Sequence, residues 1–340
     1  MNRSEIGWPL RLFLILVCVA GCTGLFQVVI FLWDGTLHVS RLRICLAVGL
    51  PMVIARRAYN KRSLDLGGSV ASVIVGAVIT LHSYAHMCSM MAFFYTSSRL
   101  TNFRQNRKRA LEADSKEGGQ RTWKQVLCNG GPAVLFALVS LIDPSVHVLG
   151  MERRLRLRRR GGFDVAAWHD LAMLGSIASA AGDTWASEVG SVVGGQEPRL
   201  ITNFKKVPRG TNGAVSLVGT VCSVAGGTVV GIAYWLSLSL LASDQSLDSM
   251  YWYPVPQWVF IVVCALCGGL GSLIDSLLGA MFQYSGFDTK LSCIVEEPGP
   301  NVRRISGRAW LDNNSVNLLS AFSMALMTPM LAERVCWSLL

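Results

Sequence analysis

Residues 180–190 read Ala-Ala-Gly-Asp-Thr-Trp-Ala-Ser-Glu-Val-Gly, and residues 198–213 read Pro-Arg-Leu-Ile-Thr-Asn-Phe-Lys-Lys-Val-Pro-Arg-Gly-Thr-Asn-Gly. The first part places a carboxylate, Asp183, at the end of an apolar segment. The second part places Lys205, Lys206 and Arg209 among residues that favour turns. Carboxylates bind metal ions, and cations beside glycines bind phosphate groups. The stretch therefore predicts a phosphate-binding site attached to an apolar scaffold.

The composition identifies that scaffold as membrane-embedded. Of the 340 residues, 51% are hydrophobic and 15% are charged, against about 25% charged in soluble domains. Several apolar runs approach the ~20 residues that cross a bilayer as a helix. The net charge of +10 is concentrated in the connecting segments, which in a membrane protein indicates topology. We expect an integral, multi-pass protein whose partner is the lipid bilayer, with no nucleic-acid partner.

Nine apolar segments are candidate spans, namely residues 10–33, 44–55, 66–81, 84–100, 126–142, 165–181, 213–242, 258–282 and 314–331. Pro51 predicts a kinked or tilted second span. Residues 126–142 either cross the membrane or are re-entrant, because the arginine-rich residues 153–160 beyond them conflict with the positive-inside rule if they cross. We expect an all-α polytopic protein with roughly seven to nine spans, some short or re-entrant. The whole chain, residues 1–340, would form one integral membrane domain.

Charge also distinguishes the two membrane faces. Residues 243–257 contain two acids, no Lys or Arg, and an aromatic cluster, which is typical of a non-cytosolic face. The segments around Lys205 and Arg304 are basic, so we expect both on the cytosolic face. Asp183, Asp275 and Asp312 would then lie near the same face as these cations.

Three positions carry most of the chemical argument. A carboxylate inside a span costs roughly 2.5 to 3.5 kcal/mol on insertion scales, so Asp275 is a functional candidate, with a structural hydrogen bond between helices as the alternative. Asp312 is a metal-ligand candidate and also a favourable N-cap for the last helix. Beyond it, Asn313, Asn317 and Ser320 form a polar helical stripe that should face the protein interior.

Two further patterns have simpler interpretations. His82 and His86 are four residues apart, as in a metal-binding pair, but we favour two interfacial histidines at a hairpin turn. Cys264 and Cys267 form a C-x-x-C pattern inside a predicted span without a second pair, so we expect neither a zinc site nor a disulfide there. Gly227 and Gly231, also four apart, predict a close helix–helix approach.

Residues 182–190, 202–213 and 311–317 resemble the hallmark motifs of the integral membrane family that includes animal transmembrane protein 19 and plant phytyl-phosphate kinase. The likeness covers nearly the whole chain, including residues 61–65, 116–121 and 271–276. A weaker likeness is to CTP-dependent dolichol kinases and phosphatidate cytidylyltransferases. The chain lacks the Pro-Gly-His-Gly-Gly segment and the aspartate pair of the cytidylyltransferases, which favours a kinase.

The resemblance implies a phosphotransferase that uses CTP or another NTP to phosphorylate an isoprenyl monophosphate of the phytyl, farnesyl or geranylgeranyl type. Mg²⁺ is the expected cofactor, because it binds carboxylates together with substrate phosphates. We expect the enzyme in an endomembrane such as the endoplasmic reticulum. Two other functions remain open: a transporter or channel for a phosphorylated lipid or an ion, and a non-catalytic membrane scaffold.

The site residues follow from these motifs. Asp183, Lys205, Lys206 and Arg209 are assigned to catalysis, and Asp183, Asp275 and Asp312 to metal binding. The residues assigned to substrate binding are polar side chains and glycines of the same motifs: Ser187, Glu188, Gly210, Asn212, Gly213, Asn313, Asn314 and Asn317.

Overall fold

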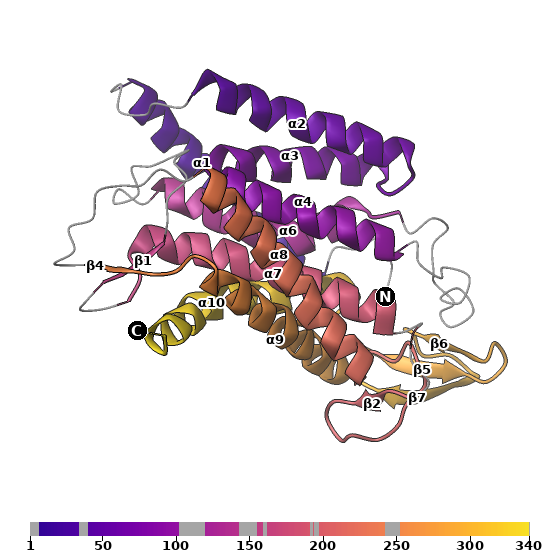
Figure 1. The fold of residues 1–340 in the computed structure, drawn as a ribbon. Coiled ribbons are helices and arrows are strands. Elements are labelled where there is room, and N and C mark those ends of the chain that lie inside the picture. Colours follow the sequence, from indigo (N-terminus) through magenta and orange to yellow (C-terminus); the bar gives the residue numbers. More distant parts are fainter. Residues whose placement is uncertain are drawn as a thin grey trace.

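The computed structural model describes residues 7–33, 40–101, 120–142, 155–158, 162–190, 193, 197–241 and 252–339. Long helices dominate this part of the chain (Figure 1). They are α1 (Trp8–Trp33), α2 (Arg41–Asn60), α3 (Leu66–His82), α4 (Tyr84–Thr101), α6 (Trp123–Ile142), α7 (Val165–Gly190), α8 (Leu217–Leu241), α9 (Val259–Phe282) and α10 (Asn313–Trp337). Each predicted apolar segment overlaps one of these helices, although the segment predicted from residue 213 becomes helical only at Leu217.

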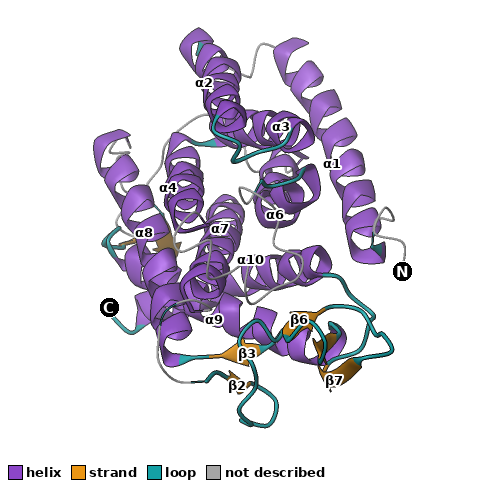
Figure 2. Ribbon diagram, turned by 90° about the vertical axis from the view of Figure 1, so that its right-hand side faces the viewer, coloured by secondary structure: helices purple, strands orange, loops and turns teal. Residues whose placement is uncertain are grey.

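Helix α7 forms the centre of the bundle (Figure 2). Helices α4, α6, α8, α9 and α10 pack against it, while α1, α2 and α3 lie further out. The middle of α7 is fully buried, including Leu171, Met173, Leu174 and Ile177. A helix that is apolar on all sides is stable only when it is surrounded, which explains its central position.

Glycines let α7, α8 and α9 approach one another closely. A Cβ atom at Gly182 of α7 would lie 2.6 Å from the Cα of Gly268 in α9, and one at Gly268 would lie 2.9 Å from the Cα of Gly227 in α8. The predicted close approach at Gly227 and Gly231 is therefore confirmed. Because Gly182 directly precedes Asp183, this contact fixes that carboxylate beside α9.

Among the described residues, three small antiparallel sheets correct the expectation of an all-α chain. One sheet has the order β6-β5-β7, from β5 (Ser285–Asp288), β6 (Cys293–Val295) and β7 (Val302–Ser306). Strands β2 (Arg199–Leu200) and β3 (Ala214–Val215) form a hairpin, and β1 (Arg156–Arg158) pairs with β4 (Trp252–Pro254).

The strands mark the two ends of the bundle (Figure 1). Strands β2, β5, β6 and β7 lie at one end, called the sheet end below, and β1 and β4 lie at the other. The described part of the arginine-rich segment, Arg156–Arg158, thus lies beside the aromatic strand Trp252–Pro254. Helix α6 is continuous over Trp123–Ile142, with Pro132 inside it, and whether it crosses the membrane or is re-entrant stays open.

The described helices have the surface of a membrane protein. Helices α8, α9 and α10 are long and apolar enough to cross a membrane by length and composition. Large apolar side chains are also exposed on other helices, such as Val53 of α2 and Val70 of α3, with exposures of 67% and 56%. Such extensive apolar exposure suits contact with lipid. The exact number of spans remains a prediction.

Candidate functional site

A polar pocket opens at the sheet end, where α6, α7, α9 and α10 meet the β2–β3 hairpin. Every predicted site residue except Lys205 and Lys206 lines it. These lining residues are Asp183, Ser187, Glu188, Arg209, Gly210, Asn212, Gly213, Asp275, Asp312, Asn313, Asn314 and Asn317. They come from four separate segments of the chain, so the fold brings the predicted motifs together in one place.

Asp275 and Asp183 form the innermost acidic pair of the pocket. The Ser320 hydroxyl donates a hydrogen bond to Asp275 Oδ2 at 3.1 Å. With the Asn317 amide oriented to satisfy its neighbours, its nitrogen donates to the same oxygen at 3.2 Å and to the carbonyl of Asn313 at 3.0 Å. Asn317 and Ser320 of the predicted stripe therefore face inward, whereas the Asn313 side chain is exposed and accepts a hydrogen bond from Gln283 at 3.4 Å. The two carboxylates are close enough to repel each other.

The chemistry of this pair suits a hard divalent cation. Among the described residues, neither Asp183 nor Asp275 forms an ion pair with a Lys or Arg side chain. Two like charges in a desolvated place disfavour each other unless a cation or a proton neutralises them. The polar groups next to the two acids are hydroxyls and amides, including the hydroxyl of Ser272, which hydrogen-bonds Asp183. Carboxylate, hydroxyl and amide oxygens are the kind of ligand atoms that fit Mg²⁺.

Asp312 begins helix α10 as its N-cap, as expected from the sequence. Its Oδ1 accepts a hydrogen bond from the backbone amide of Ser315 at 3.0 Å and another from the Ser315 hydroxyl. Its Oδ2 accepts a longer one from Asn314, at 3.5 Å. The capping interaction fixes the carboxylate at the pocket wall. Its predicted role as a metal ligand stays a prediction, since a carboxylate has lone pairs beyond those that a cap uses.

The loop of residues 209–213 is held against α9 and the sheet. Gly210 and Gly213 have φ angles of 87° and 79°, a region that glycine adopts most easily. A Cβ atom at Gly213 would also lie 2.6 Å from the backbone nitrogen of Ala280 in α9. The backbone amide of Asn212 donates to Ser285 Oγ of β5 at 3.0 Å. These contacts position Arg209 and the loop backbone at the pocket.

Lys205 and Lys206 lie elsewhere on the β2–β3 hairpin. Both side chains are exposed, and neither residue lines the pocket. Lys206 Nζ is 3.5 Å from Glu197 Oε2, and both of these side chains are 66% exposed. The hairpin packs its apolar residues, Leu200 and Val207, against α9, which turns the intervening lysines outward. Their catalytic role remains a prediction that the geometry does not favour.

Arg121 is a pocket residue to which the sequence assigned no role. Its guanidinium is desolvated by burial, which lowers its pKa, while the charge of Glu188 opposes that shift. Thr101 donates to Glu188 Oε1 at 3.1 Å. The backbone of Arg121 is fixed by Ser63, whose carbonyl accepts at 3.0 Å, and by Asp65, whose amide donates at 3.2 Å. Residues 61–65 and 116–121 both belong to the motifs that resemble the family, and these backbone hydrogen bonds join the two motifs at the pocket.

His82 and His86 lie far from this pocket, at the predicted hairpin turn between α3 and α4. His82 Nε2 is 2.9 Å from Asp170 Oδ1, and His86 Nε2 is 2.9 Å from the backbone oxygen of Asp170. Asp170 lies near the start of α7, whereas Asp183 lies near its end. The cluster has the residue types of a metal site, with its ligand atoms within 4.8 Å of one another. Its described contacts join α3 and α4 to α7.

The family model described as integral membrane protein DUF92 matches residues 49–325. The chain belongs to the DUF92 family. The match runs from within α2 to the middle of α10, and the lining of the polar pocket, from Asp65 to Asn317, lies inside it. The family resemblance inferred from the motifs is thus confirmed, as is the multi-pass membrane character.

Relatives of this DUF92 chain occur in plants and archaea. Protein PGR of Arabidopsis thaliana is 37% identical over 289 residues, covering 84% of this chain and 95% of that protein. Protein VTE6, chloroplastic, of the same plant is 24% identical over 259 residues, covering 76% and 62%. An uncharacterized membrane protein of Methanocaldococcus jannaschii is 28% identical over 247 residues, covering 72% and 85%. No solved structure matches the chain.

Proposed function

We propose that this DUF92 protein is a membrane-embedded phosphotransferase that moves a phosphoryl group from CTP or another NTP to an isoprenyl monophosphate. The observation that carries the proposal is the polar pocket itself. Acids suited to a metal, a glycine loop with Arg209, and the asparagines of α10 all line it. The resemblance of these same motifs to phytyl-phosphate kinase supplies the substrate class.

In this proposal, Asp183, Asp275 and Asp312 would hold Mg²⁺. The ion, when bound, neutralises phosphate charge and orients the donor nucleotide. Arg209 and the adjoining glycine loop bind phosphate oxygens of the nucleotide. Asn313, Asn314 and Asn317 complete the polar wall, and Asn314 and Asn317 orient Asp312 and Asp275 through hydrogen bonds.

The transfer itself needs little covalent help from the protein. An oxygen of the lipid monophosphate attacks the γ-phosphorus of the NTP, the bond from that phosphorus to the β-phosphate oxygen breaks, and the nucleoside diphosphate leaves. Because a phosphomonoester has a second pKa of about 6, the attacking oxygen is already deprotonated at neutral pH. No histidine is among the described lining residues, which agrees with a reaction that needs no general base. Positioning and charge stabilisation remain as the main requirements.

Transport of a phosphorylated lipid or ion would use the same acids but needs a polar path to the other end. The α7 residues beneath Asp183 are largely apolar and fully buried, including Leu171, Leu174 and Ile177. This packing favours a pocket that opens at one end. A scaffold function would leave the arrangement of the acids without a role.

The test uses purified full-length protein in lipid nanodiscs. We expect it to convert phytyl, farnesyl or geranylgeranyl monophosphate to the diphosphate with labelled CTP or another NTP, in the presence of Mg²⁺. Nucleotide binding should depend on Mg²⁺ even without the lipid substrate. Absence of Mg²⁺-dependent binding for all four NTPs would overturn the proposal in favour of a transporter or scaffold.

A further inference from the structure

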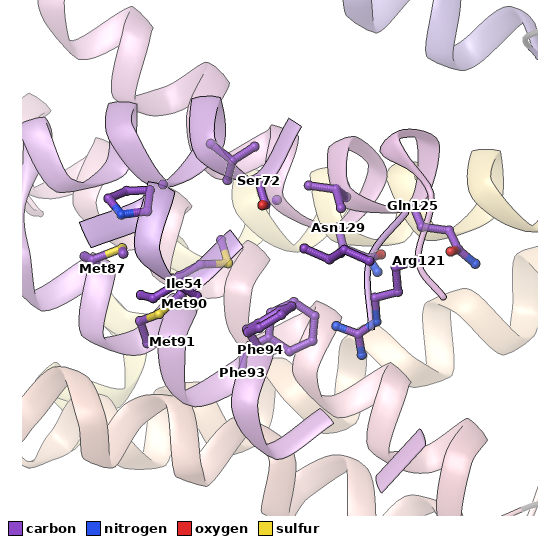
Figure 3. A pocket seen from close by; sticks show the side chains of 16 residues that line it. Ile54, Ser72, Met87, Met90, Met91, Phe93, Phe94, Arg121, Gln125 and Asn129 are labelled. Atoms are coloured by element: carbon purple, nitrogen blue, oxygen red, sulfur yellow. The ribbon is translucent and has the colours of Figure 1, made fainter. Parts of the chain in front are cut away.

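A second cavity lies between α2, α3, α4 and α6, beside the polar pocket (Figure 3). Its walls are mostly apolar, with methionines and phenylalanines prominent. Methionine side chains adapt to irregular shapes, which suits a flexible hydrocarbon with methyl branches.

The two ends of this cavity differ in polarity. Met87, Met90 and Ile54 lie toward one end, while Arg121 and Gln125 lie toward the other (Figure 3). The polar end also includes Asn129, and all three polar residues line the large polar pocket as well. The apolar cavity therefore adjoins the pocket that contains the acids.

Arg121 marks the junction between the two spaces. Its guanidinium carbon lies 5.8 Å and 5.9 Å from the ring centres of Phe93 and Phe94, at the apolar wall. The guanidinium remains a cation in proteins and presents paired N–H donors that match a phosphate. A ligand that fills both spaces would thus have an apolar chain joined to an anionic head.

We propose that this cavity holds the hydrocarbon chain of the isoprenyl monophosphate, with Arg121 binding its phosphate at the entrance to the polar pocket. The identity of the head group rests on the proposed function. The apolar lining supports a hydrocarbon chain, and the polar residues shared with the acidic pocket support a phosphorylated one. The methionine end then limits the chain length, because the terminal isoprene unit packs against Met87 and Met90.

The first test is photo-cross-linking of full-length protein in phosphatidylcholine nanodiscs. The probe is geranylgeranyl monophosphate with a diazirine at the end of the chain. We expect cross-links on the segment containing Met87 and Met90, displaced by unlabelled geranylgeranyl monophosphate. Cross-links confined to lipid-facing residues, or equal displacement by phosphatidic acid, would overturn the proposal.

A matched pair of variants on α3 tests the cavity by occlusion. Ser72 lines the cavity, whereas Val70 is 56% exposed on the same helix. We expect Ser72→Trp to weaken displaceable probe labelling about tenfold or more, and Val70→Trp to leave it unchanged. Equal labelling of both variants would contradict the proposal. If Ser72→Trp does not fold, the cross-link position in the unmodified protein still decides whether the cavity holds the hydrocarbon chain.

Arg121→Gln separates this inference from the proposed function. We expect the variant to lose affinity for the monophosphate probe while binding the uncharged geranylgeraniol analogue as before. Mg²⁺-dependent CTP binding should persist in Ser72→Trp, whose substitution lies outside the acidic pocket. Displaceable probe labelling without any nucleotide binding would refute the kinase proposal and leave the chain-binding cavity standing. Nucleotide binding without displaceable labelling would refute only the cavity.

Discussion

The carboxylate of Asp275 combines an intramembrane position with donors from Ser320 and Asn317. These two donors would also hydrogen-bond a neutral amide, so Asp275→Asn keeps the size and most of the local bonding. We expect it to insert and fold normally but to abolish transfer and weaken Mg²⁺-dependent nucleotide binding, because Mg²⁺ prefers anionic oxygen. Equilibrium nucleotide binding with and without Mg²⁺ provides the measurement.

Glu333→Gln is the matched control for this carboxylate, since Glu333 lies near the end of α10 that is remote from Asp312. It should bind nucleotide as the unmodified protein does. If Asp275→Asn retained full transfer activity, Asp275 would have only a structural role, as the acceptor of a hydrogen bond between helices.

The cations of the β2–β3 hairpin divide into pocket and surface residues. We expect Arg209→Gln to reduce turnover by about a hundredfold or more, since one lost contact to a developing oxyanion costs about 2.7 to 4 kcal/mol in known enzymes. Lys205→Gln with Lys206→Gln should have a much smaller effect, because both side chains are exposed outside the pocket. Steady-state kinetics on protein with verified insertion measures both. A larger loss from the lysine pair would restore their predicted catalytic role.

Single residues were predictable from sequence when their environment was local. The N-cap role of Asp312 and the inward stripe of Asn317 and Ser320 follow from spacing along one helix. The place of Arg121 was not predictable, because its position depends on a backbone bridge to the segment before α3. The outward direction of Lys205 depends on how the hairpin packs, which no local pattern encodes.

At the scale of helices, close contacts at glycine set the geometry of the acids. Gly182→Ala would place a methyl group against the backbone of Gly268, so α7 and α9 must move apart. We expect a lower Tm and weaker Mg²⁺-dependent nucleotide binding, because Asp183 and Asp275 would separate. A Cβ atom at Gly49 of α2 has nothing within 4 Å, so Gly49→Ala should be neutral or slightly stabilising. Thermal unfolding in nanodiscs compares the two, and equal Tm values would contradict the tight contact.

The His82–Asp170 contact joins the α3–α4 hairpin to the central helix. Removing one partner of such a pair leaves the other polar group poorly satisfied, which costs about 1 to 3 kcal/mol for a buried hydrogen bond. We expect His82→Ala and Asp170→Asn each to lower the Tm, and the double variant to lower it by less than the sum. A double-mutant cycle on thermal unfolding measures this coupling, and strict additivity would rule it out.

Most helices were predictable because apolar length is a strong signal. The predicted segments overlap the observed helices, but α2, α6, α7 and α10 extend several residues further at one or both ends, and α8 begins four residues later than predicted. These extensions contain polar residues, so a hydropathy window leaves them out of the predicted span. Their backbone can still continue the helical hydrogen bonds at a membrane interface. The strands were missed because each is only two to five residues long and depends on pairing with a distant segment.

At the scale of the molecule, the fold separates two polar ends by an apolar bundle. The sheet end has the acids, the glycine loop and the β5–β7 sheet, and the opposite end has β1 paired with β4 (Figure 1). The arginine-rich strand β1 therefore lies at the end whose other strand lacks Lys and Arg. If the sheet end faces the cytosol, as we expect, strand β1 departs from the positive-inside rule, which counts Lys and Arg in the segments next to spans.

That departure makes topology the decisive test for the whole molecule. Strand β7 with Arg304 and the hairpin with Lys205 both lie at the sheet end, so cysteines at these two positions should react from the same side, and we expect the cytosolic side. A cysteine at Arg156 should react from the opposite side, as should one at Ser246, a position outside the described residues. The assay uses a membrane-impermeant thiol reagent on sealed vesicles and a background without reactive native cysteines. Labelling of positions 205 and 156 from one side would contradict the two-ended architecture, and with it the placement of the acidic pocket at a single membrane face.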